Sequence, residues 1–139
     1  MKQIDILEEV TLNTMHKMLF LLEETAPDGK LENDYEFMAE VEYRETRIEL
    51  LFTYELAKKI TQNFLGKETL PRKKDILDSL KEITNIISGN FMGIIYPEKS
   101  DKIPIPNVKK NKESKDENTY HSKTIFYEDE KPLKIKLKK

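Results

Sequence analysis

Cysteine is absent from this chain of 139 residues, and glycine occurs only four times. Without cysteine the chain can form no disulfide, has no thiolate nucleophile and cannot build a cysteine-ligated zinc site. A strong excess of one charge is also missing, because 24 Lys and Arg residues stand against 26 Asp and Glu residues, for a formal net charge of −2. This balance argues against a protein that binds nucleic acid.

Long apolar runs are missing as well. No stretch approaches the roughly 20 residues that a membrane-spanning helix needs, and the N-terminus carries Asp5 where a signal peptide would have an uninterrupted apolar run. We therefore expect a cytoplasmic protein without a membrane partner. The length predicts a single domain over residues 1–139. Six Tyr and six Phe, together with the small net charge, argue against full disorder.

Hydrophobic periodicity predicts a helix followed by a hairpin in the first part of the chain. The helix should run from Ile4 to about Glu24, because apolar residues recur there at spacings of three and four. Alternation from Tyr35 to Tyr43 predicts a strand, and a second strand begins at Ile48, so the two form an antiparallel hairpin. The residues expected on the buried face of this first helix are Ile4, Leu7, Met15, Met18 and Leu22.

Two further helices are predicted next. Thr53 can cap a short helix that runs to Leu65 and stops at Gly66. A second long helix should run from Asp75 to about Ile95, before Pro97. The residues expected to face the core from these two helices are Leu56, Ile60, Phe64, Ile76, Leu80, Ile83, Ile87, Phe91 and Ile94.

The remaining residues predict a mobile loop and a second hairpin. Residues 107–118 contain a single apolar side chain, Val108, which favours a loop. Closing strands are expected at Tyr120–Tyr127 and Leu133–Leu137. The resulting order predicts an α+β fold built from two helix–hairpin pseudo-repeats, with long helices packed on one face of an antiparallel sheet.

The second long helix carries an unusual exposed strip. On a helical projection the apolar residues cluster on one side, and Asp78, Glu82 and Asn85 fall within about 40° of the opposite direction. Gly89 and Gly93 continue the same strip. A glycine inside a helix costs about 1 kcal/mol relative to alanine, and neither packing nor a turn explains two of them here. A flat surface for an approaching partner would explain them.

Glu82 and Asn85 offer specific chemistry on this strip. A carboxylate can pair with a lysine or arginine of a partner, and a carboxamide can accept and donate hydrogen bonds at once, which suits the orientation of a water molecule. Water placement of this kind is a recognised role in phosphoryl hydrolysis. The ordinary alternative for both residues is a solvated helix face.

The residues 78–90, DSLKEITNIISGN, resemble the active helix of the CheC/CheX/FliY chemotaxis phosphatases. The family signature is Asp or Ser, three residues, Glu, two residues, Asn, and a proline further downstream. Residues 39–66 are also similar to the hairpin and short helix that precede this helix in the family, so the resemblance covers most of the chain. It implies a CheC/CheX-like fold and a phosphatase acting on a phosphorylated CheY-type response regulator.

The resemblance also implies roles for individual residues. Glu82 would pair with a lysine of the regulator, and Asn85 would orient the attacking water. Asp78 matches the first motif position and would support the motif and the helix geometry. Gly89 and Gly93, which keep the strip flat, are the residues expected to support partner binding beside it. The chain itself would hold no metal or other cofactor, and Mg²⁺ would belong to the acidic pocket of the regulator.

Two departures from the family pattern matter. The downstream proline has two candidates, Pro104 and Pro106, of which we take Pro106 as the supporting residue, although the segment from Asn85 is short. Two-site members repeat the motif on the first long helix, but Glu8 and Glu9 are followed three positions later by Thr11 and Leu12. That helix should be silent, which is the single-site arrangement of CheX-like members that pair as homodimers.

Other interpretations remain open. A non-catalytic binding or adaptor module in chemotaxis or flagellar signalling would have the same fold, and the sequence names neither the regulator nor the pathway. His16 and His121 lie far apart without the spacing of metal ligands. The alternating Lys-rich C-terminus is better explained by a half-buried strand than by an RNA- or membrane-binding tail.

Overall fold

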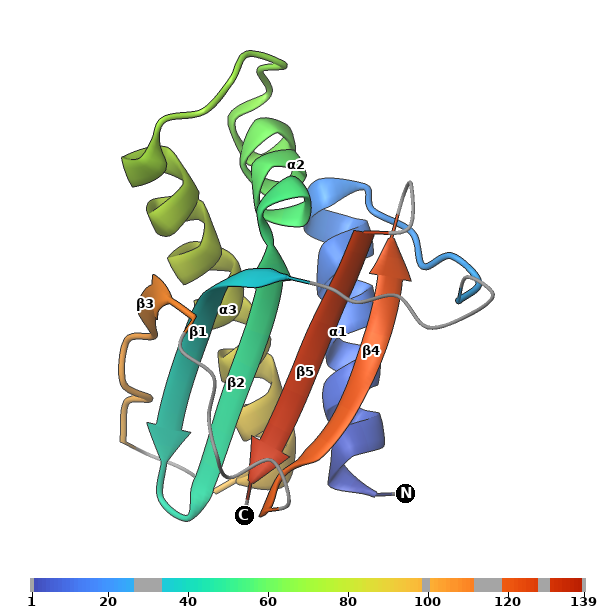
Figure 1. Cartoon of the computed structure of the whole chain (residues 1–139). Coiled ribbons are helices and arrows are strands. Elements are labelled where there is room, and N and C mark those ends of the chain that lie inside the picture. The colour runs from blue at the N-terminus through green and yellow to red at the C-terminus, as the bar shows by residue number, and fades with distance from the viewer. Residues whose placement is uncertain (1, 27–33, 99–100, 112–118, 128–130, 139) are drawn as a thin grey trace.

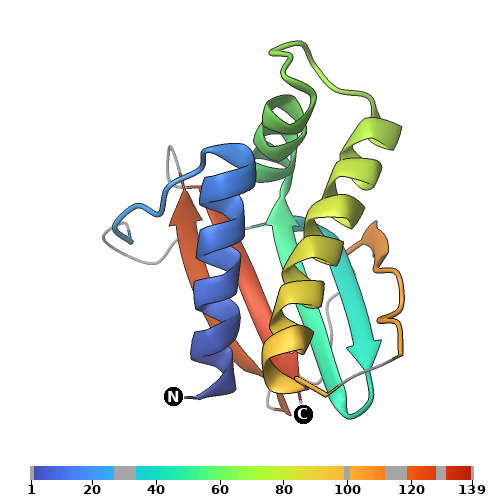
Figure 2. The same ribbon diagram turned by 180° about the vertical axis from the view of Figure 1, so that it is seen from behind.

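The computed structural model describes residues 2–26, 34–98, 101–111, 119–127 and 131–138. Three helices and five strands follow one another in these residues as α1 (Gln3–Leu19), β1 (Tyr35–Tyr43), β2 (Thr46–Thr53), α2 (Tyr54–Leu65), α3 (Lys73–Ile95), β3 (Asn107–Lys110), β4 (His121–Tyr127) and β5 (Lys131–Lys138). The strands form an antiparallel sheet in the order β3-β1-β2-β5-β4. Figures 1 and 2 show the long helices α1 and α3 on the same face of this sheet, so the predicted α+β fold is confirmed.

The two hairpins are arranged symmetrically about the middle of the sheet. Strand β2 pairs with β5 at the centre, and β1 and β4 flank this pair on the two sides. Helix α1 packs over β4 and β5, whereas α3 packs over β1 and β3. Each long helix therefore covers the hairpin of the other pseudo-repeat, and each presents its outer face to solvent (Figure 2).

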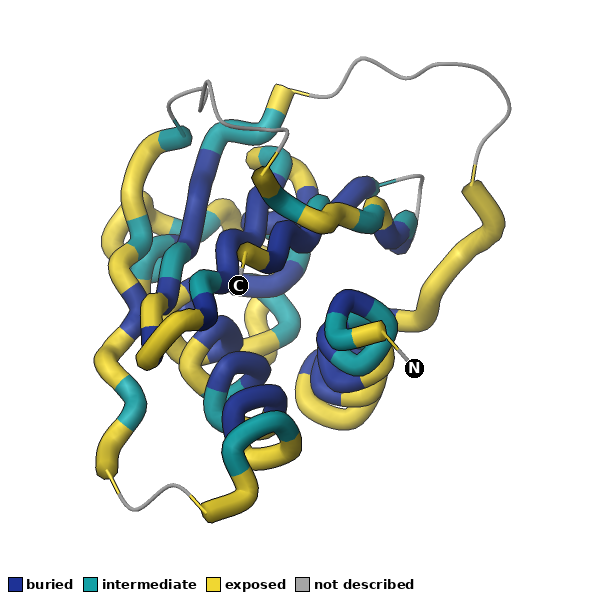
Figure 3. Tube along the Cα trace, turned by 90° about the horizontal axis from the view of Figure 1, so that it is seen from below, coloured by how far each residue is buried: buried dark blue, intermediate teal, exposed yellow. Residues whose placement is uncertain are grey.

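The core lies between the helices and the sheet. Figure 3 shows the buried stretches of α1 and α3 turned toward the strands, and the exposed stretches turned away from them. The predicted apolar stripe of α3 is confirmed at Ile76, Leu80, Ile83, Ile87 and Phe91, which are all buried.

The prediction for the last turn of α3 was wrong. Ile94 is 54% exposed, while Met92 is fully buried. The chain returns past α3 after its end, and Ile103 packs against the same core cluster as Met92. Periodicity along one helix cannot anticipate this contact from a later segment.

The first helix ends earlier than predicted. Phe20 has a left-handed backbone (φ 57°, ψ 28°), and the cap N–H groups donate to the carbonyls of His16 and Met15. This closes α1 at Leu19, so Met18 and Leu22 lie outside the core, 47% and 63% exposed, while Val10, Leu19 and Leu21 are buried. A left-handed conformation costs a non-glycine residue roughly 1–2 kcal/mol.

The short helix begins and ends as predicted. The Leu56 N–H donates to the Thr53 hydroxyl oxygen over 3.2 Å, and Gly66 has the left-handed backbone (φ 66°) of a C-terminal cap. Leu56 and Ile60 are buried as expected. Phe64 is 38% exposed, because it lies in the last turn of α2, whose buried residues end at Thr61.

The predicted mobile loop over 107–118 was wrong in its first part. Asn107–Lys110 is strand β3, which pairs antiparallel with β1. Val108 packs against the core, and the Asn111 side-chain amide donates to the Tyr35 carbonyl over 3.0 Å. Because the ladder to β1 and the Asn111 anchor secure it, one apolar residue suffices for this edge strand. Residues 112–118 lie outside the described residues.

The sheet face opposite the helices carries a polar network. Arg47 forms ion pairs with Glu40, Glu42 and Glu49, and Glu49 also accepts a 2.8 Å hydrogen bond from the Tyr120 hydroxyl. Burial together with this bond raises the pKa of Tyr120 to about 12. Lys136 lies 3.7 Å from Glu49, and both side chains are almost fully buried. Arg47, Lys136 and the three glutamates are thus paired with one another within the chain.

Candidate active site on helix α3

The predicted strip on α3 lies on the outer face of the helix. Asp78, Glu82 and Asn85 are exposed, and the apolar residues of the same helix face the sheet. Their spacing explains this arrangement, because residues four and seven positions apart lie within 40° of one another around a helix. A carboxylate and a carboxamide are therefore presented one turn apart on one surface.

The polar groups of the strip are not engaged within the chain. Across the described residues, the side chains of Asp78, Glu82 and Asn85 form neither a hydrogen bond nor an ion pair with another residue. Most other charged side chains discussed above are paired. The carboxylate and amide of the strip thus keep their full capacity to bind a partner or a water molecule.

Gly89 and Gly93 extend the strip without a packing reason. A Cβ atom built at either position would meet nothing within 4 Å apart from the neighbouring residues and the helix's own backbone. Neither glycine has a positive φ angle. Neither side-chain packing nor the backbone angle requires glycine at these two positions. Close contact with a partner molecule explains the two glycines better.

The backbone beneath Asn85 is held from the buried side of the helix. The Ser88 hydroxyl, which is fully buried, lies 2.8 Å from the Thr84 carbonyl oxygen and 3.2 Å from that of Asn85. It therefore donates within the turn that carries the candidate catalytic amide. Periodicity assigned no role to Ser88, because a small polar residue on a helix gives no distinctive signal.

The far end of α3 is clamped to the β1–β2 turn. The Arg44 guanidinium lies 5.0 Å from the ring centroids of both Tyr43 and Tyr96. The Tyr96 and Thr46 hydroxyls are 2.7 Å apart, and Asp101 accepts hydrogen bonds from Tyr43 and Arg44. The Tyr43 hydroxyl bond, with the nearby Arg44, lowers the pKa of Asp101. These contacts fix α3 against the sheet.

The other predicted site residue lies apart from the strip. Pro106 is buried and immediately precedes β3, so it belongs to the segment that holds the edge strand beside α3. The structure does not bring it together with Glu82 and Asn85 on the exposed surface. Its predicted supporting role remains a prediction.

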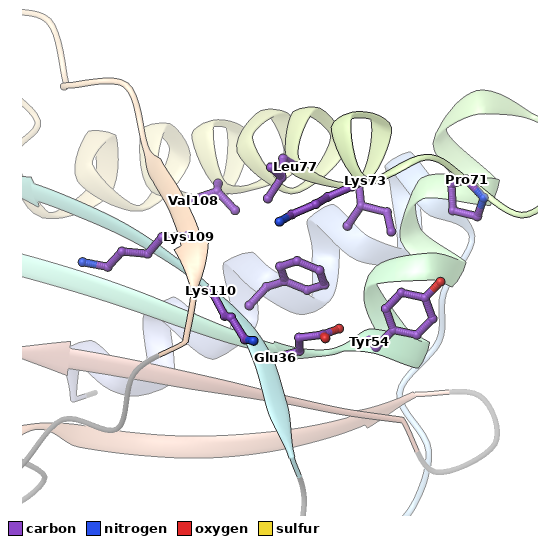
Figure 4. A pocket seen from close by; sticks show the side chains of 10 residues that line it. Glu36, Tyr54, Pro71, Lys73, Leu77, Val108, Lys109 and Lys110 are labelled. Carbon is purple, nitrogen blue, oxygen red and sulfur yellow. The ribbon is translucent and has the colours of Figure 1, made fainter.

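A pocket that periodicity did not predict lies beside the first turns of α3. It has a volume of about 480 Å³ and is formed between α3, β1, β3 and the start of α2. Figure 4 shows Leu77, Val108 and Lys73 along one side of it, with Lys110, Glu36 and Tyr54 along the other. Glu82 and Asn85 are not among its lining residues, so this pocket is separate from the strip.

The described residues contain no group of three or more His, Cys, Asp or Glu side chains arranged to hold a metal ion. His16 lies on α1 and His121 on β4. Within the same residues, no helix combines the length and the apolar character needed to cross a membrane.

Comparison with known proteins identifies the fold. Residues 43–128 match the family model described as chemotaxis phosphatase CheX. The chain is similar to the crystal structure of CheX from Desulfovibrio desulfuricans, with a TM-score of 0.75 at 14% identity, covering 99% of this chain and 98% of that one. No curated protein sequence matches the chain.

Two further solved structures share this architecture. The CheX–CheY–BeF₃–Mg²⁺ complex of Borrelia burgdorferi matches with a TM-score of 0.72 and 16% identity over 99% of this chain and 97% of that one. FliY of Thermotoga maritima matches with a TM-score of 0.60 and 15% identity over 97% and 88%. With a family model that matches well over half of its residues and a shared fold along nearly its whole length, this chain belongs to the CheX family of chemotaxis phosphatases.

Proposed function

We propose that this protein hydrolyses the aspartyl-phosphate of a CheY-type response regulator. The observation that carries the proposal is the exposed Glu82–Asn85 pair on α3, whose side chains form no bond to any described residue and lie beside two glycines without a packing role. Membership of a phosphatase family and the CheX–CheY complex of Borrelia burgdorferi support a CheY-directed activity.

In this proposal Glu82 docks the regulator and Asn85 orients the water. The carboxylate of Glu82 pairs with a lysine of the regulator and thereby places α3 over the phosphorylated aspartate. The side-chain oxygen of Asn85 accepts a hydrogen bond from a water molecule that attacks phosphorus in line. The bond from phosphorus to the aspartate oxygen breaks as the bond from water forms, which yields inorganic phosphate and a free aspartate.

Mg²⁺ is assigned to the regulator. Magnesium ions are usually held by one or two carboxylates together with phosphate oxygens and water, and a response regulator contributes both the carboxylates and the phosphoryl group. The CheX–CheY complex of Borrelia burgdorferi contains Mg²⁺ and BeF₃. The strip of this chain then acts by placement rather than by metal binding.

The test is a single-turnover dephosphorylation assay with phosphorylated CheY-type regulators of the source organism. We expect Asn85→Ala to lower the rate by about 100-fold, because misplacement of a reacting group by about 1 Å already costs that much. Regulator binding should persist in this variant. Glu82→Ala should weaken binding as well as turnover.

Controls separate this role from loss of structure. Asn85→Asp keeps the side-chain shape but replaces the amide donor with a negative charge beside the phosphate, and it should also be inactive. Glu55→Ala removes an exposed carboxylate from α2 and should leave the rate unchanged. Wild-type turnover by Asn85→Ala would refute the assignment of the catalytic amide.

The adaptor alternative predicts a different pair of results. A non-catalytic module would form a clear complex with the regulator while the lifetime of the regulator phosphate stays constant over a wide range of protein concentrations.

The homodimer expected from the resemblance is a separate prediction. Sedimentation velocity of the purified chain measures it directly.

A further inference from the structure

The pocket at the start of α3 is lined by polar side chains that have no partner in the chain. These four side chains are Lys73, Lys110, Glu36 and Tyr54. Across the described residues, none of the four forms a hydrogen bond or an ion pair. On the outer face of the sheet, by contrast, Arg47 is bound to three glutamates. The pocket can therefore offer donors and acceptors to a ligand without breaking contacts of the fold.

Strand β3 directs two side chains into this pocket. Lys110 is the register partner of Phe37, and Val108 lies two positions before it. Both therefore lie on the sheet face that carries Phe37, toward the helices. Lys109, between them, points to the other face, where it is bound to Glu40 over 3.1 Å. The pocket thus receives one ammonium group and one apolar side chain from β3.

A bulge in β1 adds the carboxylate of Glu36. The register of β1 with β2 shifts between Tyr35 and Phe37, so Glu36 is an extra residue without a partner on β2. Consecutive side chains of a regular strand point to opposite faces, but Glu36 and Phe37 both line the pocket. The Asn111 N–H donates to the Glu36 carbonyl over 2.8 Å and holds the bulge in place. Bulges are over-represented next to active sites, where they redirect a side chain.

The remaining lining is largely apolar. Phe37 and Ile76 belong to the buried core, and Leu77 and Val108 pack against it. The volume of about 480 Å³ lies within the roughly 300–1,000 Å³ of small-molecule sites. Such sites combine an apolar lining with a few polar groups that orient the ligand. The pocket has both features.

The charges of the pocket favour an anion. Figure 4 shows Lys73 and Lys110 on opposite sides of it, with Glu36 on the side of Lys110. Two ammonium groups against one carboxylate leave an excess of positive charge, which attracts an acidic group. The Glu36 carboxylate can accept a hydrogen bond from a donor elsewhere in the same ligand.

We propose that this pocket binds a small amphipathic anion, a molecule with one acidic group, an apolar body and one hydrogen-bond donor. The site is separate from the one proposed for the regulator, because Glu82 and Asn85 do not line it. The start of α3 at Lys73 is about 18 Å from Asn85 along the helix axis. Residues of α2, α3, β1 and β3 enclose the pocket, which suits a small molecule better than a protein surface.

The experiment titrates the purified protein with 6-(p-toluidino)naphthalene-2-sulfonate and follows the fluorescence of this probe. The probe has one sulfonate, an apolar aromatic body and one N–H group. The same amine without the sulfonate, N-(p-tolyl)-2-naphthylamine, is the neutral comparison. We expect the sulfonate to bind about tenfold more tightly than the neutral amine, because two exposed ion pairs contribute up to about fivefold each.

Substitutions in the pocket should change the affinity in opposite directions. Lys73→Met and Lys110→Met should each raise the Kd of the sulfonate by up to about fivefold, and the Kd of the neutral amine should stay unchanged. Glu36→Gln should lower the Kd of the sulfonate, because it removes a negative charge and keeps a hydrogen-bond acceptor. Amide NMR shifts caused by the probe should be concentrated at residues 36–37, 73–77 and 108–110.

Lys74→Met is the matched control. Lys74 is exposed in the same turn of α3 but does not line the pocket. Its substitution changes the net charge equally and should leave the Kd of the sulfonate at the wild-type value. An equal loss of affinity in Lys74→Met would show that net charge, rather than the pocket, attracts the probe, and the proposal would fail.

Three other outcomes would overturn the site. The first is an equal sulfonate Kd in the wild type and in the double variant Lys73→Met, Lys110→Met, or NMR shifts confined to other residues. The second is an affinity that falls as the protein concentration rises, which would show that a second copy of the chain fills the pocket. The third is the absence of sulfonate binding to the wild type.

Discussion

The two long helices occupy equivalent places in the fold but differ in how they use their polar residues. On α1, Glu8 is bound to Lys123 of β4 over 3.2 Å, and the Thr11 hydroxyl is buried and donates to the Leu7 carbonyl over 2.7 Å. On α3, Glu82 and Asn85 are exposed and unengaged by any described side chain. The same helix position is thus structural in one repeat and open in the other.

This difference shows why the motif spacing alone is insufficient. Glu8 and Thr11 have the spacing of Glu82 and Asn85, yet α1 is turned so that the second of its two residues faces the core. The catalytic role proposed for α3 requires both residues on the outer face and no internal partner for the carboxylate. Rotation of the helix about its own axis decides between a site and a structural element.

Grafting the motif onto α1 tests this comparison and should have the largest effect. Thr11→Asn gives α1 a Glu-x-x-Asn sequence that begins at Glu8, but it places a carboxamide in a fully buried position. We expect the free energy of unfolding to fall by about 1–3 kcal/mol, measured by urea denaturation. Introduced into Asn85→Ala, the change should not restore phosphatase activity, and any recovered turnover would show that α1 is competent after all.

The order and type of the helices and hairpins were predictable because they depend on local periodicity. The Thr53 cap and the Gly66 stop follow from single residues with strong local preferences. The strip followed from helix geometry, since residues opposite an apolar stripe must be exposed. Knowledge of the family added the proposed roles of Glu82 and Asn85.

The predictions failed where a distant segment decides the outcome. Strand β3 exists because β1 offers an edge and Asn111 anchors to Tyr35. Helix α1 stops at Leu19 because the chain then turns toward the edge of β4, where Glu24 N–H donates to the Phe126 carbonyl over 2.7 Å. Such contacts have no signature within the segment itself, and the exposure of Met18 and Leu22 that results could therefore not be predicted from the sequence.

The glycines of α3 offer the second test of the comparison, with smaller effects. Gly89→Ala and Gly93→Ala should each raise the free energy of unfolding by up to about 1 kcal/mol, because alanine favours the helix and its methyl group meets no obstacle. The same methyl groups should weaken regulator binding several-fold by raising the surface of the strip. Denaturation and binding titrations measure the two effects separately.

Gly66→Ala is the contrasting variant for these glycines. Gly66 has a positive φ angle, so alanine there should destabilise the fold rather than stabilise it. If Gly89→Ala and Gly93→Ala gained stability and bound the regulator with unchanged affinity, a flat strip would not be required. The two glycines would then have no role in docking.

The ion pairs of α1 give the smallest expected effect, and acid sensitivity reveals it. A hydrogen bond from Lys123, over 2.6 Å, lowers the pKa of Asp5. Because the pKa is lower in the folded state, this pair stabilises the protein above the unfolded pKa of about 3.9, and that contribution is lost as the pH falls through the folded value. Lys123→Met should therefore reduce the decline in melting temperature between about pH 5 and pH 3.

Lys73→Met is the control for this prediction. It removes an exposed lysine of α3 that forms no ion pair with the described residues, and it should leave the decline in melting temperature unchanged. Equal pH profiles for wild type and Lys123→Met would show that the pairing of α1 with β4 contributes nothing to its structural role.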